Sequence, residues 1–233
     1  MTSPDTAHQE KHFESYVISK LAALGWKVGE TTHYDTERAL YPEDVVSWLE
    51  ATQKTKWDKL CKDNADRAQN LLLDKVASAL DKHGTVQVLR QGLPIAGCGH
   101  IDLSEAAPED RRNEDVLKRY AANILRVVPQ LQYHPSRKLA IDLVLFINGI
   151  PVATVELKTD FTQSAESAME QYRNDRLPYD PKSKRKEPLL TFKRGAVVHF
   201  AMSDSDIQMA TKLDGANTFF LPFNQGNNEI GRA

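Results

Sequence analysis

Three charged residues interrupt two apolar runs near the middle of the chain. Asp142 lies inside the run 139–147, while Glu156 and Lys158 stand two positions apart where the run beginning at Ile150 ends. A charge in an apolar strand is costly unless it is neutralised, paired or bound to a metal ion. Two carboxylates and one ammonium group in neighbouring strands therefore indicate a divalent-cation site.

The dipeptide Asn148-Gly149 between the two runs is a strong β-hairpin signal. Counting back from a two-residue turn places Asp142 near residues 155–156, and a bulge at Pro151 would shift this register by one residue. Side chains alternate along a strand, so Glu156 and Lys158 share one face. The hairpin thus predicts that the charged groups converge.

This arrangement suits hydrolysis at a phosphate. Asp142 and Glu156 could hold one Mg²⁺, a hard cation that prefers carboxylate oxygens. Lys158 would lie beside a water on that cation, orienting it and offsetting charge on the phosphate. The alternative is a Glu-x-Lys pair on the solvated face of an edge strand. Both runs are apolar on both faces, as buried strands are, and this favours the metal site.

The pattern Asp142 … Glu156-Leu157-Lys158 after a hairpin resembles the catalytic core of the PD-(D/E)XK nuclease superfamily. Further segments are similar to the N-terminal nuclease domain of the motor (restriction, R) subunit of Type I restriction-modification enzymes. They are Ser164–Arg176, Phe192–Ala201 and Phe219–Asn224. The opening His12-Phe13-Glu14, followed by Leu24-Gly25-Trp26, is similar to that family's first helix. The resemblance covers most of the chain, and is strongest from about residue 139 to 224.

The resemblance implies a restriction-endonuclease-like fold and a Mg²⁺-dependent endonuclease acting on double-stranded DNA. It implies Asp142, Glu156, Lys158 and Gln171 as catalytic residues, the first two as metal ligands. Some members carry Gln-x-x-x-Tyr on the helix after the catalytic strand, whereas here Tyr172 follows Gln171 directly. Tyr172 is therefore carried over with less support than Gln171.

Two other departures concern the edges of the resemblance. Ile141 stands where the superfamily's name has proline, a common variation, and the chain contains no GxxxxGK[ST] phosphate loop. ATP chemistry therefore belongs to a motor region outside these residues. We expect residues 1–224 to be an excised or truncated nuclease domain with a helical insertion over about 43–82, and 225–233 to be a tail leading toward that motor.

A basic segment provides the predicted DNA contact. Residues 181–194 hold six basic residues and one acid, in a chain whose formal net charge is −2. A local patch must therefore supply any phosphate binding. The residues predicted to contact DNA are Tyr172, Arg173, Arg176, Lys182, Lys184, Arg185 and Lys186. The alternative is a mobile, solvated loop, and a loop that orders on DNA would satisfy both interpretations.

Apolar periodicity and turn signals predict the remaining elements. Helices are expected over 9–24, 43–49, 54–62, 64–82, 113–125 and 163–176, and strands over 85–91, 126–134, 196–203, 208–213 and 217–220 around the hairpin. This order predicts an α/β fold: a mixed sheet of about four to six strands flanked by helices, with the hairpin at its centre. Glu14 on the first helix either reaches the metal site through water, as an acid does in many nucleases of the superfamily, or is a surface glutamate.

Composition restricts the setting. Hydrophobic residues make up 41% and charged residues 27% of the chain, as in soluble globular proteins. Cys61 and Cys98 lack metal or disulfide spacing, and neither a membrane-spanning run nor a secretory signal is present. We therefore expect a cytoplasmic protein without a membrane partner.

The function predicted is a DNA endonuclease module that cuts without reading sequence itself. In the resembled family, target specificity lies in a separate subunit and cleavage is coupled to ATP-driven translocation. Modification and specificity subunits are thus the implied partners. The alternative is a non-catalytic DNA-binding or subunit-docking module with a vestigial nuclease core.

Overall fold

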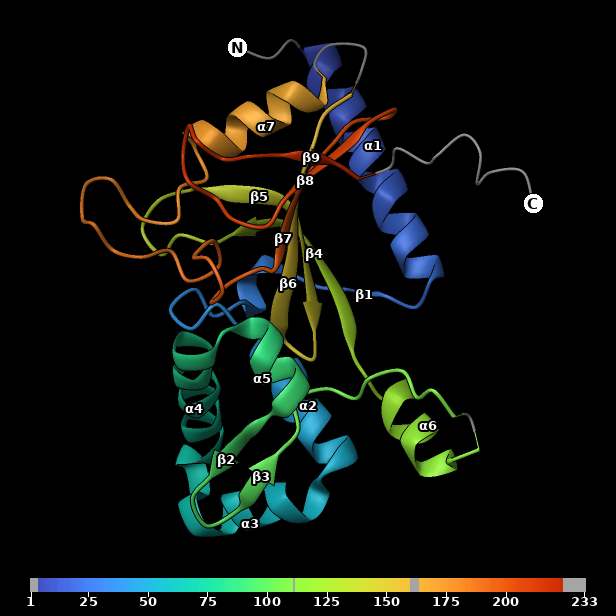
Figure 1. Cartoon of the computed structure of the whole chain (residues 1–233), viewed down its shortest axis with the longest axis vertical. Coiled ribbons are helices and arrows are strands. Elements are labelled where there is room, and N and C mark those ends of the chain that lie inside the picture. Colours follow the sequence, from blue (N-terminus) through green and yellow to red (C-terminus); the bar gives the residue numbers. More distant parts are fainter. Residues whose placement is uncertain (1–3, 111, 160–163, 224–233) are drawn as a thin grey trace.

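The computed structural model describes residues 4–110, 112–159 and 164–223, and the predicted tail at 225–233 lies outside them. The described residues form a seven-stranded sheet with helices beside it and a group of helices at its lower end (Figure 1). Its strands, which lie side by side in chain order, are β1 (Lys27–Val28), β4 (Leu125–Gln132), β5 (Ala140–Ile147), β6 (Ile150–Leu157), β7 (Val198–Met202), β8 (Ile207–Ala210) and β9 (Leu221–Pro222).

The sheet is mixed. Strands β1 and β4 pair in parallel, as do β6 and β7, while the other neighbours are antiparallel. The predicted α/β class is therefore confirmed. The sheet has more strands than expected because β1 and β9, at its edges, are two residues long and leave no readable pattern. The expected strand over 217–220 is wrong, since β9 begins only at residue 221.

Each face of the sheet packs against one helix. Helix α1 (Pro4–Ala23) covers the face on which Val155 and Leu157 are buried. Helix α7 (Ala165–Asn174) covers the opposite face, where Ala168 and Tyr172 join the main core. The helices expected over 9–24 and 163–176 are thus present, although residue 163 lies outside the described residues. Among those described, no helix combines the length and apolar character needed to cross a bilayer.

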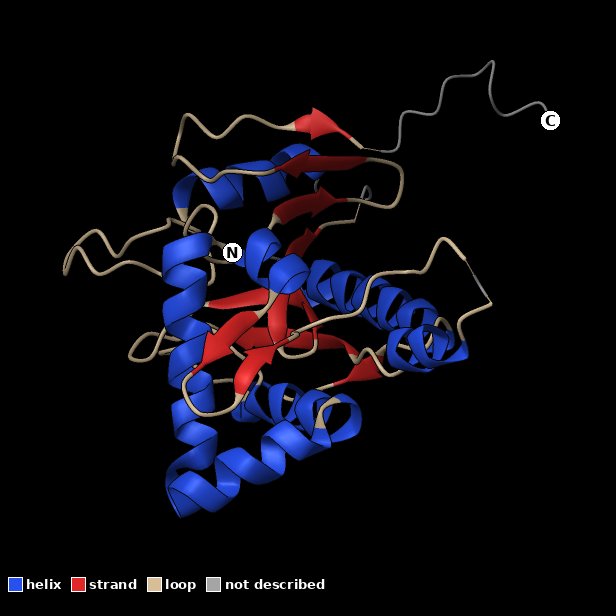
Figure 2. Cartoon of the chain, turned by 60° about the horizontal axis from the view of Figure 1, so that its bottom comes forward, coloured by secondary structure: helices blue, strands red, loops and turns tan. Residues whose placement is uncertain are grey.

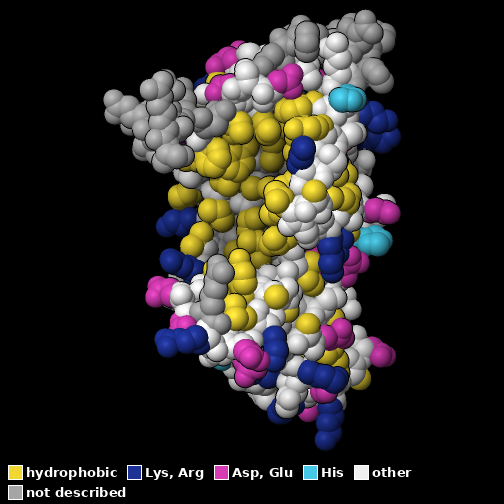
Figure 3. Space-filling view, turned by 90° about the vertical axis from the view of Figure 1, so that its right-hand side faces the viewer, with side chains coloured by type: hydrophobic (Ala, Val, Ile, Leu, Met, Phe, Trp, Pro, Cys, Tyr) yellow, Lys and Arg dark blue, Asp and Glu magenta, His cyan; other side chains and the backbone are white. Residues whose placement is uncertain are grey.

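The sheet face under α1 is incompletely covered. Leu145, Phe200 and Met202 pack against the buried cluster but stay half-buried. Figure 3 shows a hollowed area lined by hydrophobic side chains on the side of the molecule where α1 lies. Apolar patches of this kind are surfaces on which other protein can pack.

A helical body lies at one end of the sheet (Figures 1 and 2). It contains α2 (Pro42–Thr52), α3 (Lys54–Asn64), α4 (Ala68–His83), α5 (Thr85–Gln91) and the small hairpin β2 (Leu93–Ile95) and β3 (Gly99–Ile101). The body has its own buried cluster, which includes Trp48 and Leu72 and reaches the sheet through Ile150. The indole N–H of Trp48 donates to the carbonyl of Asp102 at 2.8 Å, so this tryptophan is a packing residue.

The expected strand over 85–91 is wrong, because these residues form α5. The run is only seven residues long, and its β-branched residues favour a strand locally. Contacts with residues distant in sequence favour the helix instead. The Thr85 hydroxyl donates to the carbonyls of Arg194 and Gly195, and the backbone N–H of Thr85 donates to the carbonyl of Lys193. Tertiary anchoring of this end overrides the local preference.

Helix α6 (Glu114–Ala121) is shorter than the expected 113–125. It begins at the Asn113 cap, whose side chain accepts hydrogen bonds from the N–H groups of Asp115 and Val116. It ends early because Leu125 already belongs to β4, the strand expected over 126–134.

The hairpin that carries the acids turns at Asn148 and Gly149, both with positive φ. Pro151 pairs with Phe146 but Ala153 pairs with Leu145, so one residue bulges between them. The unpaired residue is Val152, directly after Pro151, where the bulge was expected, and the shift has the expected size of one residue. Because Leu143 then pairs with Val155, the next positions along the strands set Asp142 beside Glu156.

Candidate active site

Asp142 is fixed from two sides. One carboxylate oxygen accepts a hydrogen bond from the backbone N–H of Leu157 at 2.8 Å, and the other accepts one from the side-chain amide of Gln130 at 3.1 Å. The first bond crosses from β5 to β6, directly after Glu156. The hairpin therefore brings the two predicted metal ligands together, as the sequence indicated.

Glu156 is completely buried. Its Oε1 accepts a 2.6 Å hydrogen bond from Nε of Arg176, whereas its Oε2 has no hydrogen-bond partner among the described residues. Burial raises the pKa of Glu156 to about 8, the Asp142 carboxylate adds to the rise, and Arg176 opposes it. The protein therefore leaves a buried carboxylate only partly compensated.

These donors fit a divalent cation. A buried oxygen without a partner is uncommon in folded proteins and calls for an explanation. Here it lies beside a second carboxylate, and carboxylate oxygens are the ligands that Mg²⁺ prefers. Asp142 and Glu156 are thus the residues that would hold such an ion.

Lys158 and helix α1 border the same site. Lys158 follows β6, and its Nζ lies 3.6 Å from Oε1 of Glu10 on α1. One turn further along α1, Glu14 accepts a hydrogen bond from the Gln130 amide that also bonds Asp142. Burial raises the pKa of Glu14, with Gln130 opposing the rise and Asp142 adding to it. Glu14 therefore belongs to the acidic cluster rather than to an open helix surface.

Comparison with known proteins identifies the family of the chain. A family model described as the N terminus of the Type I restriction enzyme R protein matches residues 8–218. The chain belongs to this family. A comparison with curated proteins gave no match. The resemblance stated from the sequence is confirmed, and the family supports a nuclease module of a restriction system acting on DNA.

Helix α7 contributes to this R-protein domain differently from expectation. Tyr172 is fully buried, and its hydroxyl shares a 2.8 Å hydrogen bond with Thr154, which in turn bonds Nδ1 of His199 at 2.8 Å. Tyr172 therefore packs against β6 in the interior and is not exposed for contact with DNA. Gln171 is half-buried on the same helix, and its catalytic role stays a prediction.

The expected phosphate contacts divide into two groups. Arg176 is buried against Glu156, so the prediction that it contacts DNA is corrected: it is a charge partner of the site. Arg173 pairs with Glu166 at 2.8 Å and is half-buried. The residues that do lie at the surface, on the loop after α7, are Lys182, Lys184 and Lys186, with Arg185 half-exposed and paired to Glu37 at 2.9 Å.

A buried cluster ties this basic loop to the end of β4. His134, Asp180 and Glu187 place one nitrogen or oxygen atom each within 4.8 Å of one another, a grouping that suggests a metal site. However, Nδ1 of His134 accepts hydrogen bonds from the backbone N–H groups of Ser136 and Arg137. Nε2 of His134 lies 3.2 Å from Oδ2 of Asp180 and 3.4 Å from Oε1 of Glu187. It also lies 3.3 Å from Nε of Arg137, whose guanidinium also pairs with Asp180. The charged groups of the cluster are therefore already paired with one another. The cluster is an anchor for the loop.

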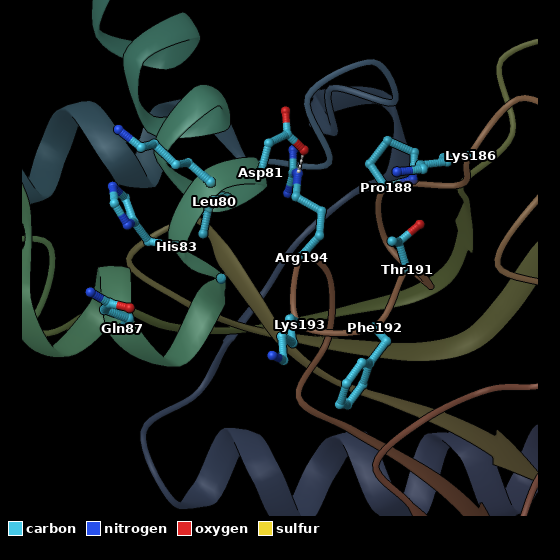
Figure 4. A pocket seen from close by; sticks show the side chains of 12 residues that line it. Leu80, Asp81, His83, Gln87, Lys186, Pro188, Thr191, Phe192, Lys193 and Arg194 are labelled. Carbon is cyan, nitrogen blue, oxygen red and sulfur yellow. Dashed lines mark hydrogen bonds and ion pairs between the residues drawn. The ribbon is translucent and has the colours of Figure 1, made fainter.

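A pocket of about 650 Å³ lies between the end of α4 and the segment 186–194. In Figure 4 the Asp81–Arg194 ion pair occupies its centre, while His83 and Lys186 lie on opposite sides and do not converge. This arrangement does not form a focused anion site.

Sequence reasoning missed one residue of the site and gave another a different role. Gln130, in β4 with φ of +46°, lies outside the motifs on which the prediction was based. Arg176, which follows α7, was predicted to contact DNA rather than Glu156. Gln130 is exposed, as is Gln132 two positions on, so its residue type alone gave no signal.

Proposed function

We propose that this R-protein domain is a Mg²⁺-dependent endonuclease module that hydrolyses phosphodiester bonds of double-stranded DNA. The observation that carries the proposal is the buried Glu156 oxygen without a partner beside the carboxylate of Asp142. Such strongly perturbed carboxylates gather at functional sites. The family match supports the same class of activity.

The chain's own residues divide the work. Asp142 and Glu156 bind the cation, while Arg176 holds one oxygen of Glu156 and the other is without a hydrogen-bond partner among the described residues. The chemistry that a divalent cation supplies here is a hydroxide nucleophile at neutral pH and stabilisation of charge on the phosphate. Lys158 orients that nucleophile and offsets the negative charge that develops during attack. Gln171 orients the Lys158 end of the site or the scissile phosphate.

The exposed lysines of the loop at 182–186 contact phosphates of the DNA backbone in this proposal. Target recognition and ATP-driven translocation reside elsewhere in the family's enzymes. The partners are accordingly the modification and specificity subunits of a cytoplasmic restriction complex, with ATP used only by the motor region.

The test is cleavage of double-stranded DNA with Mg²⁺, by the chain alone and by the assembled restriction complex. We expect Glu156→Gln, Asp142→Asn and Lys158→Ala each to reduce cleavage by at least ~100-fold, as loss of a charge-stabilising group at the reaction centre does. Glu114→Gln, an exposed glutamate on α6, is the matched control and should cleave normally. Folded Glu156→Gln protein that cuts as fast as wild type contradicts the proposal.

One observation favours the alternative of a docking module with an inactive core, namely the incompletely covered sheet face under α1. The two functions differ in metal binding. A docking module would bind no divalent cation at Asp142 and would tolerate loss of Lys158 in the assembled complex.

A further inference from the structure

Gln130 occupies an unusual backbone position inside β4. Its φ is +46°, in the left-handed region that residues other than glycine seldom adopt. Pairing with β5 is regular on both sides, where Pro129 pairs with Leu143 and Leu131 with Ile141, and is interrupted at Gln130. The interruption lies opposite Asp142. Backbone strain of this kind persists where surrounding structure enforces it, and it gathers at functional sites.

The strained backbone aims one amide at two acids. Nε2 of Gln130 lies 3.1 Å from Oδ1 of Asp142 and 2.5 Å from Oε2 of Glu14. A glutamine amide nitrogen has two hydrogens, so both are used in this bridge. The bridge joins α1 to the centre of the sheet across more than 100 residues of sequence.

The bridge also determines how Asp142 presents its oxygens. The Gln130 amide holds Oδ1 and the Leu157 N–H holds Oδ2, so the carboxylate plane is fixed by two donors. Each oxygen keeps a free lone pair for a cation. The amide is neutral, so it brings Glu14 next to a like charge without a competing positive group between them. A lysine here would place a positive charge beside the oxygens that bind the cation.

We propose that Gln130 is a positioning residue of the cation site. Its amide, aimed by the left-handed turn in β4, ties Glu14 to Asp142 and holds the Asp142 carboxylate in its binding orientation. This inference rests on the proposed function, because it assumes that Asp142 and Glu156 bind a divalent cation. It concerns an amide acting through a ligand, as groups around metal ligands commonly do.

Mn²⁺ affinity of the purified chain, measured by electron paramagnetic resonance of free Mn²⁺, tests the inference without relying on cleavage. Gln130→Ala removes the amide and keeps the backbone strain, whereas Gln130→Gly removes the amide and relieves the strain. We expect both variants to bind Mn²⁺ about 10- to 100-fold more weakly than wild type. The melting temperature of the glycine variant should nevertheless exceed that of the alanine variant.

Ala65→Gly is the matched control, because Ala65 also has a positive φ, of 48°, and lies exposed in the helical body. It should leave Mn²⁺ affinity unchanged. Wild-type affinity in both Gln130 variants would overturn the inference, and so would an affinity that followed the melting temperatures, since the backbone and not the amide would then matter. Failure of wild type itself to bind Mn²⁺, with Glu156→Gln behaving identically, would overturn the inference together with the proposed function.

Discussion

Two buried acid–arginine pairs in this protein have opposite characters. Arg126 of β4 makes two parallel contacts with Asp44 of α2, at 2.6 and 2.7 Å, so both carboxylate oxygens are satisfied. Arg176 contacts only one oxygen of Glu156, and the other is left without a partner. The first pair closes a joint between the helical body and the sheet. The second leaves a binding position open.

The difference teaches where to look for function in a charged interior. A buried pair with matched geometry compensates itself and holds structure together. A buried pair in which one carboxylate oxygen lacks a partner raises the free energy of the protein without ligand. A ligand of opposite charge that binds this oxygen lowers the free energy again. The Glu156 pKa of about 8 is the sign of this incomplete match.

The largest expected effect comes from breaking the Arg126–Asp44 pair. Asp44→Asn keeps the shape of the side chain but removes the buried charge that Arg126 contacts, leaving the exposed Glu43 at 2.7 Å as its charged partner. Loss of one partner in a buried pair destabilises by about 3–5 kcal/mol, and Glu43 should keep the loss near the lower end of this range. We expect a loss of that size in the free energy of unfolding, measured with urea. The corresponding change at the other pair, Glu156→Gln, should not destabilise the metal-free protein. An equal loss in both variants would erase the distinction.

Mg²⁺ should stabilise the folded protein only through the Glu156–Arg176 pair, which we call the open pair. At a Mg²⁺ concentration 100 times its dissociation constant, binding to the native state adds about 2.7 kcal/mol to stability. We expect this increment in wild type and in Asp44→Asn, measured as the rise in unfolding free energy over protein in chelator. Glu156→Gln should show none, and a full increment in that variant would place the ion elsewhere.

In the presence of a chelator, the open pair should make the unfolding free energy of the protein depend on pH. The folded pKa of Glu156 is raised above its ordinary value of 4.5, so its contribution is fully present below pH 4.5 and is lost as pH rises through about 8. One proton corresponds to at most about 1.4 kcal/mol per pH unit. Wild type should therefore lose stability over this window relative to Glu156→Gln. Parallel melting curves against pH would contradict the assigned titration.

The smallest effect belongs to a third, exposed pair. Arg185 and Glu37 lie 2.9 Å apart with much of both side chains in solvent, and such pairs contribute about 0–1 kcal/mol. Arg185→Ala should therefore change the unfolding free energy little, while weakening DNA binding if the loop contacts phosphates. A large loss of stability would show that the loop is part of the structural core.

Local patterns were sufficient for the centre of the fold. The Asn148-Gly149 turn and the two apolar runs predicted the hairpin and the meeting of Asp142 with Glu156, because these depend on residues within about fifteen positions of one another. They failed over 85–91, where a seven-residue run is too short for periodicity to separate helix from strand and a distant anchor at residues 193–195 decides the matter.

The sequence by itself determined the chemical inventory of this protein: which acids stand in apolar strands, which lysine follows them, and the family to which the pattern belongs. Only the tertiary structure determined which of these residues contact one another. It buried Tyr172 and Arg176 instead of exposing them. It also brought Glu14 to Gln130 across 116 positions, and Gln130 in turn to Asp142. Such contacts depend on how helices pack on the sheet, and packing is set by the whole folded chain and not by any local pattern.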